Sequence, residues 1–541
     1  MKQTTSWCYT ALAASWLVFS GGVSAAELPA GVKLAKNQEF IRNINTEPAS
    51  IDPQKVEENA GSEVVNDLFE GLFSQGANGE LRLAGATAYS VNPEGTVYTF
   101  TLRKEARWSD GVPVTAADYV YGWQRAADPA TASVYSFFIE LTGVKNAAAV
   151  IAGKMKPDQL GIVALDDHRL QITLDHPKPY LLKMLAHYTT FPAPRHVVSK
   201  YGEEWVKVGH IVGNGAYKLV EWTPNERLVA ERNPRYWDDA HTVINKVSFL
   251  EVGSDAAAFN RYRANELDYT SYPLEVRQKV RNDMPEQLVE KPLLATAYYV
   301  FNTTKAPFND ARVRRALALG FDREIITNKV LGQGQQPAYS LTPPITEGFG
   351  FQSNALMQMS QAQRVEEAGK LLAAAGYSRD NPLRFRLVFN TNEGNKTIAV
   401  AISAMWQHNL PVKVDIQNME WKTMLSTVHG GNFDVARYSW TGDYNEASTF
   451  LDQLSGSNSS NDSGWKNAGY DALLKQAYAT RDDTARNALY RQAEAILEQE
   501  MPVMPIYFYV QSRLLKPDVK GFPLGNPEDK VYSKDLYRVA P

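Results

Sequence analysis

The sequence has almost no cysteine: a single residue, Cys8, occurs among 541. Cys8 lies in an N-terminal stretch in which Lys2 precedes a short apolar run, Ala11–Ser20, and small residues, Val23–Ala25. This order is typical of a secretory signal peptide, so we predict that residues 1–25 are removed and that the mature chain begins at Ala26. The mature protein would then have no thiol, which excludes a disulfide, a thiolate metal site and a cysteine nucleophile.

Long hydrophobic runs and an excess of charge are also absent. No stretch after the leader has the roughly 18 apolar residues that a membrane span needs. Lys+Arg 56 and Asp+Glu 60 give a formal charge of −4, or −5 once Lys2 is lost, and both signs are interspersed. This pattern does not suggest nucleic-acid binding. We expect an exported, unanchored, monomeric protein of the bacterial periplasm.

Motifs for common chemistries are missing as well. The eight histidines never have the i, i+4 spacing of a helical metal pair, and no glycine-rich phosphate loop or Gly-x-Ser-x-Gly elbow occurs. We therefore predict no metal, no cofactor and no catalytic residue. A hydrolase whose catalytic triad is dispersed along the sequence stays open as an alternative, because triads are spatial rather than sequential.

What the sequence does contain is enough material for two or three hydrophobic cores. Apolar spacing predicts helices at Ser62–Phe73 and Asp483–Glu500, and Thr115 begins a helix that runs to Ala127. The second half alternates helices and strands, as a mostly parallel α/β layer does. Two strong β runs, Ala297–Asn302 and Ile506–Leu515, are predicted to cross between lobes.

The segment Asn432–Glu446 combines a predicted strand with three side chains that suit a zwitterion. Arg437, Trp440 and Asp443 lie at or just beyond the end of the strand. A carboxylate can hold an ammonium group, a guanidinium can hold a carboxylate, and an indole can pack on the chain between them. The alternative is a strand and turn that carry surface charges.

Several stretches together resemble the periplasmic oligopeptide-binding proteins, the peptide and nickel class of solute receptors that serve ATP-driven importers. The resemblance rests on Glu47–Pro53, Asp67–Leu72, Trp108–Thr115, Asn214–Tyr217, Asn233–Trp237, Pro307–Arg314, Ala375–Tyr377 and Asn432–Glu446. It runs from about Ala26 to the C-terminus and includes likeness to the murein-tripeptide-binding branch. It implies an α/β, two-lobe Venus-flytrap fold with mixed sheets and an extra subdomain in lobe I. The implied division is lobe I at 26–295 plus 511–541, with the subdomain at about 69–194, and lobe II at 296–510.

The resemblance also implies a ligand site between the lobes. Asp443 matches the residue that pairs with the ligand's α-ammonium, and Arg437 matches a guanidinium that meets the carboxylate of short peptides. For Asp443 the alternative is a turn-forming role, and for Arg437 a structural ion pair. The remaining matches are Trp421 and Trp440 as pocket walls, Tyr135 and Glu57 as lobe I contacts, and Asn390 as a polar pocket residue. Core packing is the alternative for the aromatic ones.

The sequence departs from the family pattern at charged positions. Val428, Asn395 and Leu331 stand where the best-known peptide receptors have an arginine, a histidine and a lysine, and Ala295 and Thr441 replace a cysteine pair. These losses suggest a narrower ligand range or a ligand whose negative charge lies elsewhere.

We therefore expect a receptor that captures short peptides and delivers them to an inner-membrane ABC permease. Receptors for murein tripeptide or for another solute such as a bile acid are the alternatives within this class. A periplasmic peptidase or amidase, and a peptide-holding chaperone, are alternatives of other classes.

Overall fold

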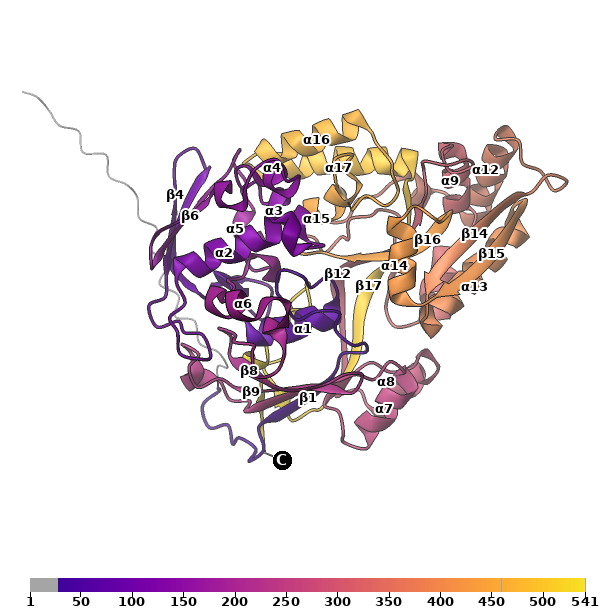
Figure 1. Ribbon diagram of the computed structural model, residues 1–541. Helices are drawn as coiled ribbons and strands as arrows, with labels where there is room; N and C mark the ends of the chain where they lie inside the picture. Colours follow the sequence, from indigo (N-terminus) through magenta and orange to yellow (C-terminus); the bar gives the residue numbers. More distant parts are fainter. Residues whose placement is uncertain (1–27, 459, 541) are drawn as a thin grey trace, which may run out of the picture.

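The computed structural model describes residues 28–458 and 460–540, so the predicted signal peptide lies outside the described part of the chain. One mixed sheet runs through the whole molecule (Figure 1). In spatial order its strands are β15 (Val412–Met419), β14 (Leu383–Asn390), β16 (Val435–Thr441), β12 (Leu288–Phe301), β17 (Val503–Leu515), β11 (Tyr269–Thr270), β1 (Glu39–Asn43), β10 (Lys246–Leu250), β9 (Arg227–Arg232) and β8 (Tyr217–Thr223), and β13 (Gln336–Pro337) pairs with β17.

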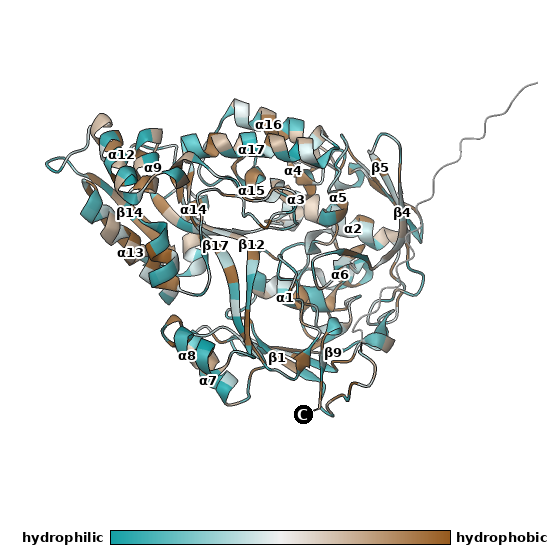
Figure 2. Ribbon diagram, turned by 180° about the vertical axis from the view of Figure 1, so that it is seen from behind, coloured by the Kyte–Doolittle hydropathy of each residue, from teal (hydrophilic) through white to brown (hydrophobic). Residues whose placement is uncertain are grey.

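Strands β12 and β17 are antiparallel neighbours that connect the two lobes (Figure 2). We call lobe I the chain before β12 together with the segment after β17, and lobe II the chain between these strands. The register of the pair shifts between Pro292 and Thr296 and again between Ala297 and Tyr298. Both predicted crossing runs overlap these strands. The predicted boundaries at 295 and 511 fall inside the strands and remain a proposal.

Lobe I carries a separate sheet in the order β4 (Ala86–Val91), β5 (Val97–Leu102), β7 (Arg169–Thr173) and β6 (Ile162–Asp166). Helix α2 (Ala116–Ala127) contacts this sheet and begins as predicted, because the Thr115 backbone N–H donates to Asp118 Oδ2 at 2.8 Å. Short helices follow at α3 (Ser136–Leu141), α4 (Ala147–Ile151) and α5 (Leu181–Met184). In Figure 1 they lie beside lobe II.

The helix predicted over Ser62–Phe73 is shorter than expected. Helix α1 spans Asn59–Leu68, and Phe69 is already extended. The side chain of Asn214 accepts from the Glu70 backbone N–H at 3.0 Å and donates to the Glu70 carbonyl at 2.8 Å. These bonds give the backbone partners outside the helix, and Phe73 then pairs with Leu83 in a small hairpin. Tertiary contacts have overridden the apolar spacing.

Lobe II packs helices on both faces of its part of the sheet. Alternate residues of β12 serve the two faces: Ala297, Tyr299 and Phe301 join one hydrophobic cluster, and Tyr298 and Val300 join the other. Helices α9 (Ala311–Leu319), α12 (Gln361–Ala374) and α13 (Glu393–Asn409) contribute to the first cluster, and α14 (Trp421–His429), α16 (Ala468–Ala479) and α17 (Asp483–Glu500) to the second. The bounds of α17 are those predicted.

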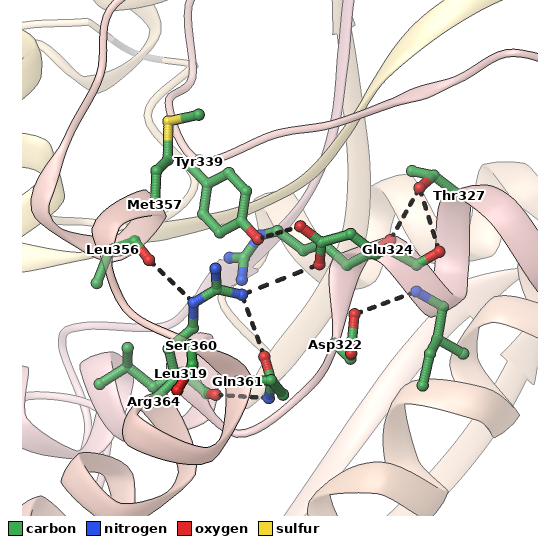
Figure 3. A network of polar contacts seen from close by, with 12 residues as sticks. Leu319, Asp322, Glu324, Thr327, Tyr339, Leu356, Met357, Ser360, Gln361 and Arg364 are labelled. Carbon is green, nitrogen blue, oxygen red and sulfur yellow. Dashed lines mark hydrogen bonds and ion pairs between the residues drawn. The ribbon is translucent and has the colours of Figure 1, made fainter.

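A polar network attaches the segment after β13 to lobe II (Figure 3). Arg364 donates to the Leu356 carbonyl at 2.9 Å and to Gln361 Oε1 at 3.1 Å. Tyr339 donates to Glu324 Oε1 at 2.9 Å, and the guanidinium groups of Arg323 and Arg364 each lie 4.8 Å from its ring centroid. Because these groups are partnered within the lobe, the network is structural.

The Asn214 bonds to Glu70 suggest a stability test. We expect Asn214→Ala to lower the free energy of unfolding by about 2–4 kcal/mol, because it leaves a buried N–H and a buried carbonyl without partners. Urea denaturation measures the loss. The matched control is Asn245→Ala, which removes an exposed asparagine; equal effects of the two substitutions would contradict the role assigned to Asn214.

Candidate functional site

The two lobes are in direct contact. A hydrophobic cluster joins Phe137, Phe138, Tyr180 and Met184 of lobe I to Tyr444 of lobe II. Beside it, Lys183 of lobe I donates to the Asn445 carbonyl at 3.0 Å and pairs with Glu347 at 2.9 Å. Side chains of both lobes are therefore packed together on the side where α3 and α5 meet lobe II.

Asp443 lies in this contact region, just after β16. Its strand is held to β12 because the Gly442 N–H donates to the Leu294 carbonyl at 2.7 Å. A Cβ at position 442 would come within 2.6 Å of the Leu294 side chain, so the close approach requires glycine. The Asp443 backbone N–H donates to Thr449 Oγ1 at 3.0 Å, and the residue is only 9% exposed.

The carboxylate of Asp443 is met by neutral groups of lobe I. Tyr135 donates its hydroxyl to Oδ1 at 3.3 Å, and His187 Nε2 lies 3.5 Å from the same oxygen. Burial lowers the pKa of His187, although Asp443 partly offsets this, so the ring is neutral at pH 7. Nδ1 accepts from the Thr189 backbone N–H, which leaves the ring proton on Nε2, facing Asp443.

No lysine or arginine of the described residues forms an ion pair with Asp443, and its Oδ2 receives no hydrogen bond from them. A carboxylate buried without a cation is unfavourable, because hydrogen bonds from neutral groups replace only part of its hydration. The site is therefore suited to receive a positive group from outside the chain.

Arg437, on β16, is a positive group without a carboxylate partner among the described residues. Its Nη2 donates to the Tyr509 hydroxyl at 2.7 Å, and its Nη1 lies 3.5 Å from Asn390 Oδ1, which also accepts from Asn395 at 2.9 Å. A small pocket in front of it is lined by Tyr298, Tyr299, Asn395, Ile398, Tyr438, Ile506 and Tyr507. The alternative assigned to Arg437, a structural ion pair, has no partner in this part of the structure.

The other predicted site residues are spread around these two charges. Trp440 packs against the interlobe cluster, and its buried Nε1 has no partner among the described residues. Trp421 is the first residue of α14 and is 38% exposed. Glu57 precedes α1 in lobe I. Partial burial and the neighbouring Glu58 raise the pKa of its carboxyl group, and His429 of lobe II partly offsets this increase. Glu57 thus faces lobe II.

Sequence reasoning missed His187 and Tyr509. Each acts through a partner distant in sequence, so neither has a local signal, although Tyr509 lies on the predicted return strand. Several departures from the family pattern lie in the cores or on paired strands. Val428 and Leu331 are 1% and 5% exposed in the two cores of lobe II, and Ala295 pairs directly with Thr441 across β12 and β16.

The fold defines a class, the two-lobe solute-binding proteins. The model of the bacterial extracellular solute-binding proteins, family 5, matches residues 80–462. The chain belongs to this family, and it is a periplasmic member of it.

Several relatives match along their full length. The chain is 45% identical over 523 residues to a periplasmic oligopeptide-binding protein of Salmonella typhimurium, covering 96% of each chain. It is 46% identical over 540 residues to the periplasmic murein peptide-binding protein of Escherichia coli, covering 100% of each. A probable deoxycholate-binding periplasmic protein of E. coli is 44% identical, with 96% of this chain and 97% of the relative covered.

Solved structures show which arrangement of the lobes is present here. A structure of the E. coli murein tripeptide-binding protein superposes with a TM-score of 0.91, at 46% identity over 94% of this chain and 100% of that one. The unliganded open form of that protein reaches 0.73, over 95% and 99%. A Haemophilus influenzae relative in complex with the peptide RPPGFSPFR reaches 0.89, at 40% identity over 94% and 100%. The lobes are therefore in the closed arrangement.

Two features are absent from the described residues. Within residues 28–458 and 460–540, no helix is long and apolar enough to cross a membrane. The same residues contain no group of three or more His, Cys, Asp or Glu placed to hold a metal ion.

The surroundings of two histidines predict different titrations. We expect His187 to gain its ring proton at lower pH than His429, because burial lowers the pKa of His187 while the Asp462 carboxylate, 2.8 Å from the His429 ring, raises that of His429. An NMR pH titration measures both, with His187→Gln and His429→Gln spectra for assignment. The reverse order would contradict the neutral form assigned to His187.

Proposed function

We propose that this protein captures short peptides between its lobes and delivers them to an inner-membrane ABC permease, as a monomer and without covalent chemistry. The observation that carries the proposal is Asp443, a buried carboxylate whose contacts in the other lobe are the neutral side chains of Tyr135 and His187 and which forms no ion pair with a lysine or arginine of the described residues. The names of the relatives, which are oligopeptide-binding and murein peptide-binding proteins, support it.

The free α-ammonium group of a peptide supplies the missing charge. An ammonium at Asp443 Oδ2 would form a charge-assisted hydrogen bond in a largely dehydrated site, where such bonds are strong. Because every unblocked peptide has this group, the contact fixes the position of the N-terminus without reading side chains. Tyr135 and His187 belong to lobe I and Asp443 to lobe II, so lobe closure completes the anchor.

Arg437 is proposed to hold the other end of the ligand. At most about 20 Å of extended chain separates Arg437 from Asp443. An extended tripeptide spans about 10 Å. Positions 428 and 331 hold apolar residues, so Arg437 is the cation that this part of lobe II presents to the carboxylate of a ligand. A single cation of this kind favours ligands of one short length.

The amine requirement separates the alternatives. A bile acid such as deoxycholate has a carboxylate but no ammonium, and it would leave Asp443 buried without a cation. A murein-derived peptide with a free amino group meets the same requirement as other short peptides. The observation thus favours peptides, including those recycled from the cell wall, over a bile acid.

An isosteric change tests the anchor. We expect Asp443→Asn to weaken binding of trialanine by about 2–5 kcal/mol, the range for removing one partner of a buried charge pair. Isothermal titration calorimetry measures the loss. N-acetyl-trialanine should bind the native protein weakly and be nearly insensitive to the substitution.

The matched control is Asp415→Asn, which neutralises an exposed aspartate on β15 of the same lobe. Unchanged trialanine binding by the Asp443→Asn variant would remove the anchor from the proposal. Time-dependent cleavage of trialanine by the native protein would show instead that it is a peptidase.

A second variant tests the carboxylate end. We expect Arg437→Met to weaken trialanine more than trialanine amide, and to weaken tripeptides more than hexapeptides, because longer ligands place their carboxylate elsewhere. Calorimetry with trialanine, trialanine amide and a hexapeptide measures this, with Arg384→Met, at an exposed position on β14, as the control. Equal losses for acid and amide would make Arg437 a structural residue.

A further inference from the structure

A lysine of lobe I is buried against lobe II. Lys178 stands between Pro177 and Pro179, which restrict the backbone, and its carbonyl accepts from Tyr98 at 3.2 Å. Although the backbone is held by lobe I, the residue is only 2% exposed and its Nζ lies 4.3 Å from the ring centroid of Tyr478 in lobe II. Among the described residues, the Lys178 Nζ makes one hydrogen bond, to the Tyr180 hydroxyl at 3.3 Å.

The facing carboxylate is Asp452 of lobe II, which is 0% exposed. The hydroxyl of Tyr478 donates to its Oδ1, and its Oδ2 has no hydrogen-bond partner among the described residues. Lys178 and Asp452 form no direct ion pair; the ring of Tyr478 stands between them. Each charge is buried with few of its hydrogen bonds made.

A neighbouring arginine, Arg486, is by contrast paired directly with two carboxylates. Arg486 Nε lies 2.7 Å from Glu446 Oε1, and Arg486 Nη2 lies 2.6 Å from Asp483. All three residues belong to lobe II, so these bonds do not depend on the position of lobe I. Lys178 and Asp452 come from different lobes, and separation of the lobes would return both charges to water.

Burying such a pair is unfavourable. Taking two charges out of water costs more than their attraction returns when they lack direct contact and further hydrogen bonds. The pKa values agree with this: burial lowers the pKa of Lys178 to about 8, against the attraction of Asp452, and raises the pKa of Asp452 to about 6, against that of Lys178. In the closed form both groups are shifted toward neutrality.

We propose that Lys178 and Asp452 act as a closure brake: one charge from each lobe, incompletely paired when the lobes meet, keeps the ligand-free receptor open. Closure then requires the free energy that a bound solute supplies. The brake rests on the geometry of the lobe contact, and it rests on the proposed function only for the choice of peptide as the solute.

The test is the double variant Lys178→Met/Asp452→Asn, which keeps the side-chain volumes and removes both charges. We expect small-angle scattering of the ligand-free protein to shift toward the compact, closed shape, and trialanine to bind about tenfold tighter or more, mainly through slower dissociation. Circular dichroism confirms that the variant is folded. The control is Lys370→Met/Glu366→Gln, which neutralises an exposed pair on α12.

Two results would overturn the brake: unchanged ligand-free scattering in the double variant, or looser trialanine binding, which would make the pair a latch. If trialanine binds neither form, the peptide proposal fails, whereas the scattering result still decides the brake. The single variant Lys178→Met removes only one of the two charges, so we expect it to tighten trialanine binding less than the double variant does, because Asp452 stays buried.

The brake also predicts a pH dependence relative to the double variant. Above about pH 8 Lys178 loses its proton in the closed form, and below about pH 6 Asp452 gains one, so either change relieves the brake. The affinity difference between native and double variant should be largest between these values and narrow on both sides. The other titratable groups facing the pair, present in both proteins, are Glu446, Arg486, His176, Tyr180, Tyr444, Tyr478 and Tyr490. A constant difference across this range would contradict the mechanism.

Discussion

A carboxylate without a cation, buried where two lobes meet, is the constraint on which the site depends. Asp443 is held by the Gly442 contact to β12 and by Thr449, while Tyr135 and His187 of the other lobe cover one of its oxygens. Neutral donors reduce the cost of burying the charge without cancelling it. In the proposed function a positively charged ligand group completes the pairing of Asp443, and the same interaction then links ligand binding to lobe closure.

The arrangement of the sheet makes such a contact reversible. Lobes I and II are connected by β12 and β17, and the pairing of these strands is irregular between Pro292 and Thr296. Arg486 is paired with Glu446 inside lobe II. Asp443, Lys178 and Asp452 lack full pairing, and they lie where the two lobes meet. Incomplete pairing at such a contact is what a receptor needs if closure is to report an occupied site.

Sequence patterns predicted the regular elements well where local signals agreed with burial. Helix α17 has the predicted bounds, and the Thr115 cap begins α2 as expected. The helix over Ser62–Phe73 was predicted too long, because apolar residues at helical spacing are also buried when Phe69 turns extended and Asn214 takes over the backbone bonds of Glu70. The spacing of apolar residues predicts which residues are buried, but it does not predict the backbone conformation of the segment that buries them.

The sequence by itself determined the near absence of thiols, the family and the composition of the segment Asn432–Glu446, and it predicted a signal peptide, since each of these depends on the residues themselves or on short runs of neighbours. Only the tertiary structure showed that His187 faces Asp443, that Arg437 has tyrosine and asparagine but no acid beside it, and that Lys178 enters lobe II. Those facts depend on residues tens to hundreds of positions apart coming within a few Å. Whether a charged side chain lacks a partner can be decided only in the folded structure. The free-energy cost of burying a charge depends on the hydration that it loses and on the hydrogen bonds and ion pairs that it gains on folding.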